Sequence, residues 1–345
     1  MQLSEVNHIE LTVVICAFNE EQHISRSILS LYAEVGNADS VEVIILDNES
    51  TDNTYRIATD TVDELNFDNA CVFSILHCPL TSSRNTGLEK ARGQYIAYVD
   101  ADGYVKPGWY KAIKKAIDEG LDIFCGTVGI DPEARGFSRF IFELHYLPSL
   151  ETASIPIIGA NMAFRVSMLR SIGGFHEVPT ARGDETLLLY LLERSSKKLI
   201  VKTDDSSIVI NTYVSDLYSW LKLQDIEGQF GAYIARRHLF FYLSGYFFRF
   251  INVFSVPLFV FSNALSSSYF FLLLGLLLIR HLKRWSYYRV SLKQQTSLLE
   301  KPLAFIILLL GSFAADFGYI RKIINQVPKF QRASVSDIIR GQNYE

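Results

Sequence analysis

Charged side chains and cysteines are scarce in this sequence of 345 residues. Only 20% of the residues are Asp, Glu, Lys or Arg, whereas 49% are hydrophobic and 13% are aromatic. This composition excludes an intrinsically disordered chain, which would be polar and poor in aromatic side chains. Four cysteines are too few for a fold held by disulfides, and no pair has the short spacing of a zinc ribbon. We expect reduced core thiols, in a reducing compartment, at Cys16, Cys71, Cys78 and Cys125.

The apolar residues are concentrated in two blocks towards the C-terminus. Residues 240–279 contain one charged side chain, Arg249, and residues 302–320 also contain one, Asp316. A helix needs about 20 apolar residues to cross a bilayer. The first block therefore predicts a hairpin of two crossings, and the second fits a third crossing or a shallow re-entrant segment. A buried core helix is the alternative interpretation.

Basic residues follow the first apolar block. Residues 1–279 hold 22 basic and 33 acidic side chains, whereas residues 280–345 hold 11 basic and 4 acidic ones. The positive-inside rule then places the segment 280–301 in the cytoplasm. The opening MQLSEVNHIE is polar and lacks the pattern of a signal peptide. We expect a multi-pass protein of the cytoplasmic (inner) membrane with a cytoplasmic body.

The body of the chain has the pattern of an α/β fold. Apolar runs of strand length at 11–15, 41–46, 71–76 and 95–99 alternate with helical patterns, which predicts a mostly parallel sheet with helices on both faces. In such sheets ligands bind at the carboxyl ends of the strands. Polar clusters follow three of these strands, which favours a ligand site over a solvated rim: Asn19-Glu20, Asp47-Asn48 and Asp100-Ala101-Asp102.

The run GQYIAYVDADGYVKPGW ends a buried strand with two carboxylates, Asp100 and Asp102. Two hard oxygen donors suit Mg²⁺ or Mn²⁺, which takes its other ligands from phosphates and water. A bare Asp-X-Asp is weak evidence alone, and a turn that caps the helix after Pro107 is the alternative. No glycine-rich phosphate loop and no Ser/His/Asp arrangement is visible. The glycine-free run CAFNEE after the first strand argues against a nucleotidyltransferase.

Four motifs occur in a fixed order: TVVICAFNEE, VIILDNESTDNT, SSRNTGLEKARGQYIAYVDADGYVKPGW and IIGANMAFRVSMLRSIGGF. In these motifs the sequence resembles the nucleotide-sugar glycosyltransferases of family 2 over residues 10 to about 205. The resemblance implies a GT-A fold, which is a Rossmann-like, mostly parallel sheet flanked by helices, followed here by C-terminal transmembrane helices. We expect a GT-A domain at 1–210, an amphipathic interfacial linker at 211–239, a membrane region at 240–322 and a polar tail at 323–345.

The resemblance also implies residue roles on the donor side. Asp47 corresponds to the residue that contacts the base, Asp100 to a contact with ribose or metal, and Asp102 to the ligand of the metal on the diphosphate. Other positions implied in nucleotide binding are Ala17, Asn19, Glu20, Arg84, Asn85 and Ala101. Alternatives remain, since Asn85 can bind a backbone carbonyl and Asn19 can cap a helix. Asp52 more naturally caps the next helix, and Glu49 replaces the glycine usual in its motif.

The general base of such transferases lies in an acidic pair downstream of the Gly-Gly-Phe motif. Asp184 and Glu185 match it by position in GGFHEVPTARGDETLLLYLLERS, with Glu185 aligned as the base and Asp184 as the fallback. Both residues can instead only favour a helix N-terminus. The turn Gly159-Ala160-Asn161 is expected on the acceptor side of the sugar. The implied reaction is direct displacement with inversion.

Two departures from the family bear on the acceptor. The segment most like a Gln-X-X-Arg-Trp motif is GQFGAYIARRH, which lacks that motif. This disfavours a processive polysaccharide synthase. The metal motif continues as Gly103-Tyr104-Val105-Lys106-Pro107, which disfavours a polyprenyl-phosphate sugar synthase without excluding it. The remaining prediction is transfer of one sugar from a UDP-hexose to a lipid-linked saccharide in bacterial cell-surface polysaccharide assembly. A catalytically inactive membrane scaffold is the alternative of another class, and no nucleic acid is expected as a partner.

Overall fold

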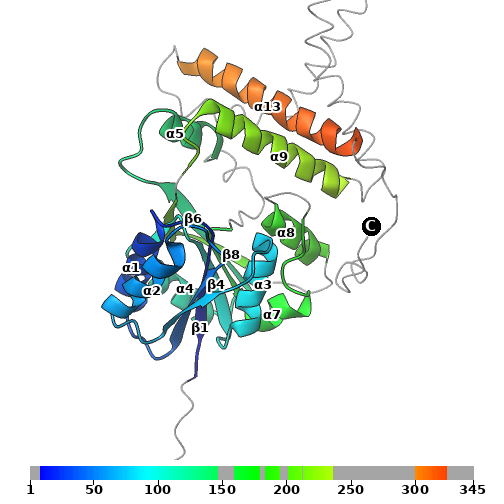
Figure 1. Ribbon diagram of the computed structural model, residues 1–345. Helices are drawn as coiled ribbons and strands as arrows, with labels where there is room; N and C mark the ends of the chain where they lie inside the picture. The colour runs from blue at the N-terminus through cyan, green and yellow to red at the C-terminus, as the bar shows by residue number, and fades with distance from the viewer. Residues whose placement is uncertain are drawn as a thin grey trace, which may run out of the picture.

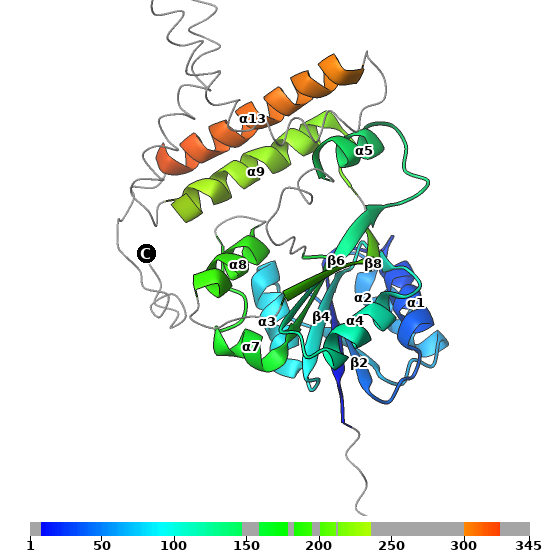
Figure 2. The same cartoon turned by 180° about the vertical axis from the view of Figure 1, so that it is seen from behind.

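The computed structural model describes residues 8–146, 159–178, 183–194, 201–211, 213–235 and 300–324 (Figure 1, Figure 2). The strands are β1 (Leu11–Ala17), β2 (Val41–Asp47), β3 (Ala70–Ser74), β4 (Tyr95–Asp100), β5 (Tyr104–Val105), β6 (Ile123–Ile130), β7 (Asn161–Arg165) and β8 (Val201–Asn211). The helices are α1 (Ile24–Val35), α2 (Thr54–Glu64), α3 (Leu80–Lys90), α4 (Trp109–Asp118), α5 (Gly136–Ile141), the π-helix η1 (Phe142–Tyr146), α7 (Val166–Ser171), α8 (Asp184–Arg194), α9 (Leu217–Ala235) and α13 (Glu300–Ile324).

One sheet organises the described part of the chain, with the strand order β3-β2-β1-β4-β7-β6-β8-β5. β3, β2, β1 and β4 run parallel, which confirms the prediction for the first four strands. β7 enters antiparallel to both β4 and β6, and β5 pairs antiparallel with β8. The second half of the sheet is therefore mixed rather than parallel. α5 and η1 follow β6 and pack away from the sheet, so they do not act as the crossover helix that a parallel pair needs.

Apolar side chains leave the central strands in both directions and build one core on each face. Val13 and Ile15 of β1 point into a core shared with α1, α2 and α4. Val14, between them, points into a second core shared with α3, α7 and α8, because side chains alternate along a strand. β2 is buried along its whole length, as expected for a parallel strand covered on both faces. Helices therefore cover both faces, as predicted.

A third core lies apart from the sheet. Trp220 of α9 packs there with Leu308 of α13 and with Ile141 at the end of α5. Both views show α9 and α13 side by side, with α13 as the outer helix (Figure 1, Figure 2). The two helices run in the same direction, because Trp220 lies against Gly311 and Asp225, further along α9, forms an ion pair with Arg321.

Glycines allow the close approach of α9 and α13. A Cβ atom on Gly228 would lie 1.7 Å from the carbonyl oxygen of Ala315. A Cβ atom on Gly318 would lie 2.0 Å from the carbonyl oxygen of Asp225. Backbone therefore packs directly on backbone, and no larger residue fits at either glycine without moving a helix.

The predicted membrane segments have different outcomes. The segment 302–320 lies within α13, where it packs against α9 and buries Asp316, so the expected third crossing is not supported. In the ranges that the structure describes, no helix combines the length and the apolar character that a bilayer crossing requires. The hairpin at 240–279 and most of the tail at 323–345 lie outside the described residues. The domain boundaries stay predictions.

The cysteines are all free, as expected. Cys125 is buried, and Cys16 and Cys78 are partly buried. Cys71 is exposed, so the expectation of a core thiol is wrong there, because β3 is the edge strand and one of its faces is open.

Candidate active site

The register of the parallel strands brings three predicted site residues to one edge of the sheet. Ala17 at the end of β1 lies opposite Asp47 at the end of β2. On the other side of β1, Cys16 lies opposite Asp100 at the end of β4. The polar residues that follow these strands therefore meet at the carboxyl edge, as the sequence predicted. The side chain of Ala17 itself points into the core, so this residue offers only backbone to a ligand.

The loop after β1 is tied to the loop after β2. Asn19 has a left-handed backbone (φ 57°), and its Oδ1 accepts a hydrogen bond of 2.8 Å from the backbone N–H of Thr51. The backbone N–H of Glu20 donates to Oγ1 of Thr54 at 2.7 Å. Asp52 accepts from the N–H of Thr54, the first residue of α2, which confirms its capping role. Asn19 and Glu20 thus shape the rim of the site.

Asp47 has the features expected of a residue that receives a base. Its side chain is buried, at 3% exposure, and Oδ2 accepts the N–H of Ser50 at 3.3 Å. Oδ1 is buried with no hydrogen-bond partner among the described residues. An unpaired buried carboxylate oxygen is costly, and a ligand N–H would satisfy it. Glu49 adopts φ 58°, the region that glycine favours, and its carboxylate accepts the N–H of His77, so the turn is kept without the glycine.

Two aromatic rings beside this edge were not singled out from the sequence. The rings of Phe18 and His77 lie 4.6 Å apart, and Phe18 is 43% exposed. The two rings add apolar surface beside Asp47. The signal available in the sequence was the position of Phe18 in the loop directly after a buried strand.

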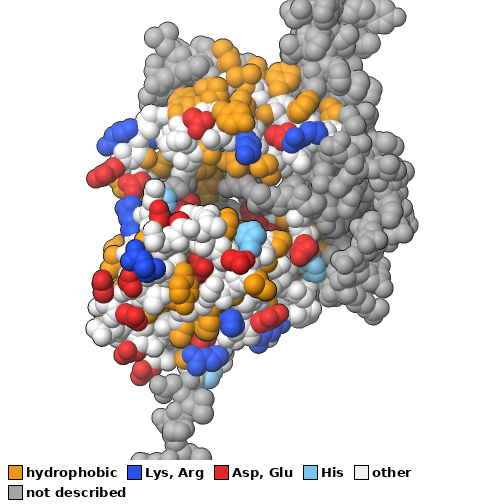
Figure 3. Space-filling view, in the orientation of Figure 1, with side chains coloured by type: hydrophobic (Ala, Val, Ile, Leu, Met, Phe, Trp, Pro, Cys, Tyr) orange, Lys and Arg blue, Asp and Glu red, His pale blue; other side chains and the backbone are white. Residues whose placement is uncertain are grey.

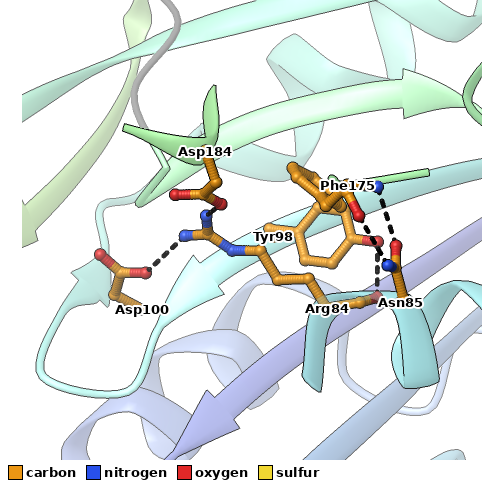
Figure 4. Close-up of polar contacts among 6 residues, drawn as sticks. All are labelled: Arg84, Asn85, Tyr98, Asp100, Phe175 and Asp184. Atoms are coloured by element: carbon orange, nitrogen blue, oxygen red, sulfur yellow. Dashed lines mark hydrogen bonds and ion pairs between the residues drawn. The ribbon is translucent and has the colours of Figure 1, made fainter. Parts of the chain in front are cut away.

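Arg84 of α3 lies at the centre of the predicted catalytic residues (Figure 4). Its guanidinium group is almost fully buried and forms an ion pair with Asp184 at the start of α8. It also lies 3.5 Å from the carboxylate of Asp100 at the end of β4. The ring of Phe175 lies 5.5 Å from the guanidinium carbon, and Tyr98 donates a hydrogen bond of 3.1 Å to the carbonyl oxygen of Arg84. Arg84 therefore joins the metal motif to the acidic pair, and its implied place beside the nucleotide stays a prediction.

The residue after Arg84 has a structural role. The amide of Asn85 donates to the carbonyl oxygen of Phe175 and accepts the N–H of Phe175, both at 2.8 Å (Figure 4). This pair of hydrogen bonds clamps α3 to the Gly-Gly-Phe segment. These hydrogen bonds match the backbone alternative for Asn85, and its implied nucleotide contact stays a prediction.

The predicted acceptor turn packs on Arg84. A Cβ atom on Gly159 would lie 2.6 Å from Nη2 of Arg84, so the guanidinium requires a glycine there. Ala160 is buried. Asn161 is buried as well, accepting from Nε1 of Trp109 at 3.0 Å and donating to the carbonyl of Thr127 at 2.9 Å. The side chain of Asn161 thus makes interior hydrogen bonds, and Gly159 lies beside Arg84, so the acceptor role of this turn stays a prediction.

The two acidic residues of the base motif have different electrostatic environments. Burial favours the neutral form of Asp184, but the charge of Arg84 and hydrogen bonds from Glu185 and Arg84 outweigh it and lower the pKa of Asp184 below its usual range. Burial, and then the charge of Asp184 and the hydrogen bond with it, raises the pKa of Glu185 to about 7. Arg84 therefore holds Asp184 as an anion, and that anion makes Glu185 more basic.

The metal motif offers two hard oxygen donors. Asp100 is partly exposed, and Nδ2 of Asn211 at the end of β8 lies 3.5 Å from its carboxylate. Asp102 is also partly buried, whereas Ala101 between them packs into the core and can offer only backbone. The described residues contain no group of three His, Cys, Asp or Glu side chains placed to hold a metal ion. Two carboxylates still fit Mg²⁺ or Mn²⁺ that takes its other ligands from a diphosphate and water. Asn211 was missed from the sequence, although it ends a strand at the same edge.

A solved structure shares this fold. The mannosyltransferase PcManGT from Pyrobaculum calidifontis, solved in complex with GDP-Man and Mn²⁺, superposes with a TM-score of 0.60. The match covers 92% of this chain and 88% of that chain at 16% identity. At this identity the likeness shows the fold alone, which is the GT-A-like α/β fold with its mixed sheet and flanking helices.

Relatives in sequence match shorter stretches. An uncharacterized glycosyltransferase, YibD, of Escherichia coli (strain K12) is 30% identical over 115 residues, which are 33% of this chain and 32% of the relative. A cholesterol galactosyltransferase of Borreliella burgdorferi is 27% identical over 121 residues, 35% of this chain and 33% of the relative. The chain thus spans about a third of the length of these two curated relatives.

The family model and the named relatives in sequence agree on the glycosyltransferase class. Residues 12–173, just under half of the chain, match glycosyl transferase family 2. This stretch is therefore similar to the family 2 glycosyltransferases, in agreement with the resemblance of its motifs.

Proposed function

We propose that this protein transfers one sugar, with inversion, from a nucleotide-diphosphate sugar to a lipid-linked saccharide at the cytoplasmic face of the membrane. One observation carries the proposal. In a domain similar to family 2, the carboxylates of Asp47, Asp100 and Asp184 gather at one edge of the sheet, and Arg84 bridges the last two. The donor is taken to be a UDP-hexose, as the sequence analysis expects, and the unpaired Oδ1 of Asp47 is the acceptor assigned to the N–H of the base.

Each carboxylate has a distinct task in this reaction. Asp47 accepts a hydrogen bond from the base through its unpaired Oδ1. Glu185 acts as the general base, because its pKa of about 7 lets it be ionised and still take a proton at neutral pH. It removes the proton of the acceptor hydroxyl, whose oxygen attacks the anomeric carbon as the bond to the diphosphate breaks. Asp184 stays ionised against Arg84 and orients Glu185.

Asp100 and Asp102 are the residues that would hold a divalent cation. When bound, Mn²⁺ or Mg²⁺ supplies Lewis-acid stabilisation of the negative charge on the leaving diphosphate. The structure of PcManGT, which contains Mn²⁺ with GDP-Man, supports this assignment by analogy of fold.

The pattern of the sequence and one relative support the acceptor and the membrane location. The sequence predicts a membrane hairpin at 240–279, and the basic segment that follows it predicts a cytoplasmic catalytic domain. The matched galactosyltransferase of Borreliella burgdorferi is named for a lipid acceptor, cholesterol. We take the role to be cell-surface polysaccharide assembly, as the layout of the chain suggests.

The test is release of the free nucleotide from a panel of UDP- and GDP-sugars. The full chain in nanodiscs is supplied with Mn²⁺ or Mg²⁺ and a bacterial lipid extract as acceptor source. We expect metal-dependent turnover of one donor, loss of turnover in Asp102→Asn, and a rate lower by about 10²–10⁴ in Glu185→Gln. Glu64→Gln, an exposed carboxylate at the end of α2, is the matched control and keeps full activity. If no donor is turned over, and the protein binds no nucleotide in the presence of metal, the inactive scaffold is the correct interpretation.

A further inference from the structure

The outer face of α13 carries an apolar stripe. Ile306 is 53% exposed and Leu310 is 40% exposed, although both are large aliphatic side chains. Phe317 is 54% exposed, and Phe313 between them is partly exposed. The spacing of four, three and four residues places these side chains on one face of the helix. Figure 3 shows hydrophobic side chains gathered over the part of the surface formed by α9 and α13.

This stripe points away from the other elements that the structure describes. The opposite face of α13 carries Leu308 and Gly311, which pack on Trp220, and Ala315, which packs on Gly228. Because α9 occupies that face, the stripe lies on the far side of α13. Both ribbon views place α13 outermost, beyond α9 and away from the sheet (Figure 1, Figure 2). A continuous apolar face on the outside of a protein marks a surface that meets a partner or a membrane.

The connection between the two helices identifies the partner as lipid. The chain leaves α9 at Ala235 and enters α13 at Glu300, and 40 of the intervening residues, 240–279, contain the single charge of Arg249. The segment 280–301 then adds six basic residues and one acidic residue. An apolar run followed by a basic one is the pattern of a chain that enters a bilayer and returns to an anionic surface.

The directions of the helices fix the orientation. Because α9 and α13 run the same way, the end of α9 and the start of α13 lie at opposite ends of the pair. At 1.5 Å per residue, the 19 residues of α9 span about 28 Å. Both ends reach one membrane surface only if the pair lies parallel to that surface. A pair that crossed the bilayer would place these two ends on opposite sides.

We propose that α13 lies in the plane of the membrane, with Ile306, Leu310, Phe313 and Phe317 at the boundary between headgroups and acyl chains. α9 then lies one layer further from the lipid, between the membrane and the catalytic site. Phe230 of α9 contacts Gly183, which is the residue before Asp184. The Phe230 ring lies 2.6 Å from where a Cβ of Gly183 would be, so α9 packs directly against the start of the acidic pair. The helix pair therefore sets the height of the acidic pair above the lipid. The surface in Figure 3 is hollowed between the helix pair and the sheet, where a lipid-linked acceptor would enter.

The membrane position of α13 is tested without turnover, and only its role in positioning the acidic pair rests on the proposed function. The full chain carrying Phe317→Trp is reconstituted into vesicles of phosphatidylcholine and phosphatidylglycerol. The vesicles are prepared with and without bromine atoms on the upper part of the acyl chains, the depth of about 5–10 Å that an in-plane helix reaches. Tyr55→Trp is the matched control, because Tyr55 is an aromatic side chain of similar exposure, 44%, on α2 of the sheet domain. The emission of the parent chain is subtracted in each case.

We expect the brominated lipid to quench most of the emission added by Phe317→Trp and to leave that of Tyr55→Trp unchanged. A tryptophan at 317 that brominated lipid does not quench, in protein that floats with the vesicles, overturns the proposal. Protein that does not float with the vesicles overturns it as well. Absence of quenching together with a dimer in detergent that Phe317→Arg converts to a monomer would assign the stripe to a second copy of the chain.

A second measurement separates this proposal from the proposed function. In Phe317→Arg we expect transfer to a vesicle-embedded acceptor to fall by about tenfold, while hydrolysis of the donor by water is unchanged. Absence of nucleotide release in the parent chain, with donor, metal and acceptor all present, contradicts the proposed function and leaves the quenching result to decide the lipid contact. Transfer equal to that of the parent chain argues that the stripe does not position the site.

Discussion

Replacing Arg84 by methionine removes the charge that joins the metal motif to the base motif. The Arg84 side chain is 4% exposed and that of its partner Asp184 is 5% exposed, so the variant leaves a buried anion without a counter-charge. Removing one partner of a buried pair costs about 3–5 kcal/mol of folding free energy. The second partner, Asp100, is 36% exposed and 3.5 Å away, so its share is reduced by solvent to about 0–1 kcal/mol. The expected loss is a large fraction of a typical stability of about 5–15 kcal/mol.

The pH dependence of this loss has a definite sign. In the native protein the pKa of Asp184 is lowered, so the stability that its ion pair contributes is present at neutral pH and is lost on acidification. In Arg84→Met, protonation of Asp184 removes its unpaired buried charge and so removes the free-energy cost of burying that charge. The difference in stability between the parent chain and the variant should therefore narrow as the pH falls towards the ordinary aspartate pKa of about 4.

Denaturant unfolding of the full chain in detergent, followed by intrinsic fluorescence, measures this difference. Arg56→Met is the matched control, because it removes an exposed Arg56–Asp60 pair on α2 and should cost about 0–1 kcal/mol at any pH. Adding Asp184→Asn to Arg84→Met should recover part of the loss, since the buried charge is then gone. A loss in Arg84→Met as small as in the control, with no dependence on pH, would refute the assignment of Arg84 as the charge that holds Asp184.

Three further predictions follow from the site and its support. The value of kcat/KM should rise with pH through about 7 as Glu185 loses its proton, and stopped-flow nucleotide release that is flat from acid to neutral pH would contradict its role as base. Asp47→Asn should weaken binding of UDP about tenfold or more by calorimetry, while Asp60→Asn leaves it unchanged, because the amide replaces the acceptor oxygen that the base needs. Gly228→Val should lower the unfolding midpoint through its clash with the carbonyl of Ala315, and an unchanged midpoint would show that the helices separate at little cost.

Much of the first half of the fold was predictable, because its strands are apolar runs between helices with ordinary spacing. β2, with seven residues buried in sequence, and the polar ends of β1 and β4 determined where the ligand edge lies. The antiparallel entry of β7 was not predictable, since it depends on α5 and η1 packing in a separate core rather than on the sheet. For a related reason the 302–320 segment was expected as a third crossing or a shallow re-entrant segment, and a crossing is not supported. Its apolar residues serve two purposes at once, contact with α9 and an exposed stripe, and composition alone does not separate them.

The site was predictable as a set of residues but not as a set of contacts. The positions of Asp47, Asp100 and Asp184 followed from motifs that end strands or begin helices. The role of Arg84 could not be read from its neighbours in sequence, because its partners come from β4 and α8. The same holds for Asn85, whose partner Phe175 is 90 residues away. Long-range pairing of this kind leaves no local pattern.

The contact between Phe230 and Gly183 bears on where this protein can be divided. Gly183 has φ 105°, and the aromatic ring of α9 fills the space that any side chain would need. A shortened chain ending at residue 210 would keep every motif of the catalytic domain and lose the ring that presses on the residue before Asp184. Such a fragment would keep its donor pocket, but Asp184 and Glu185 would lose the packing of Phe230 on one side. Exchange of acceptor specificity between related enzymes must accordingly move α9 and the 183–185 turn together as one unit.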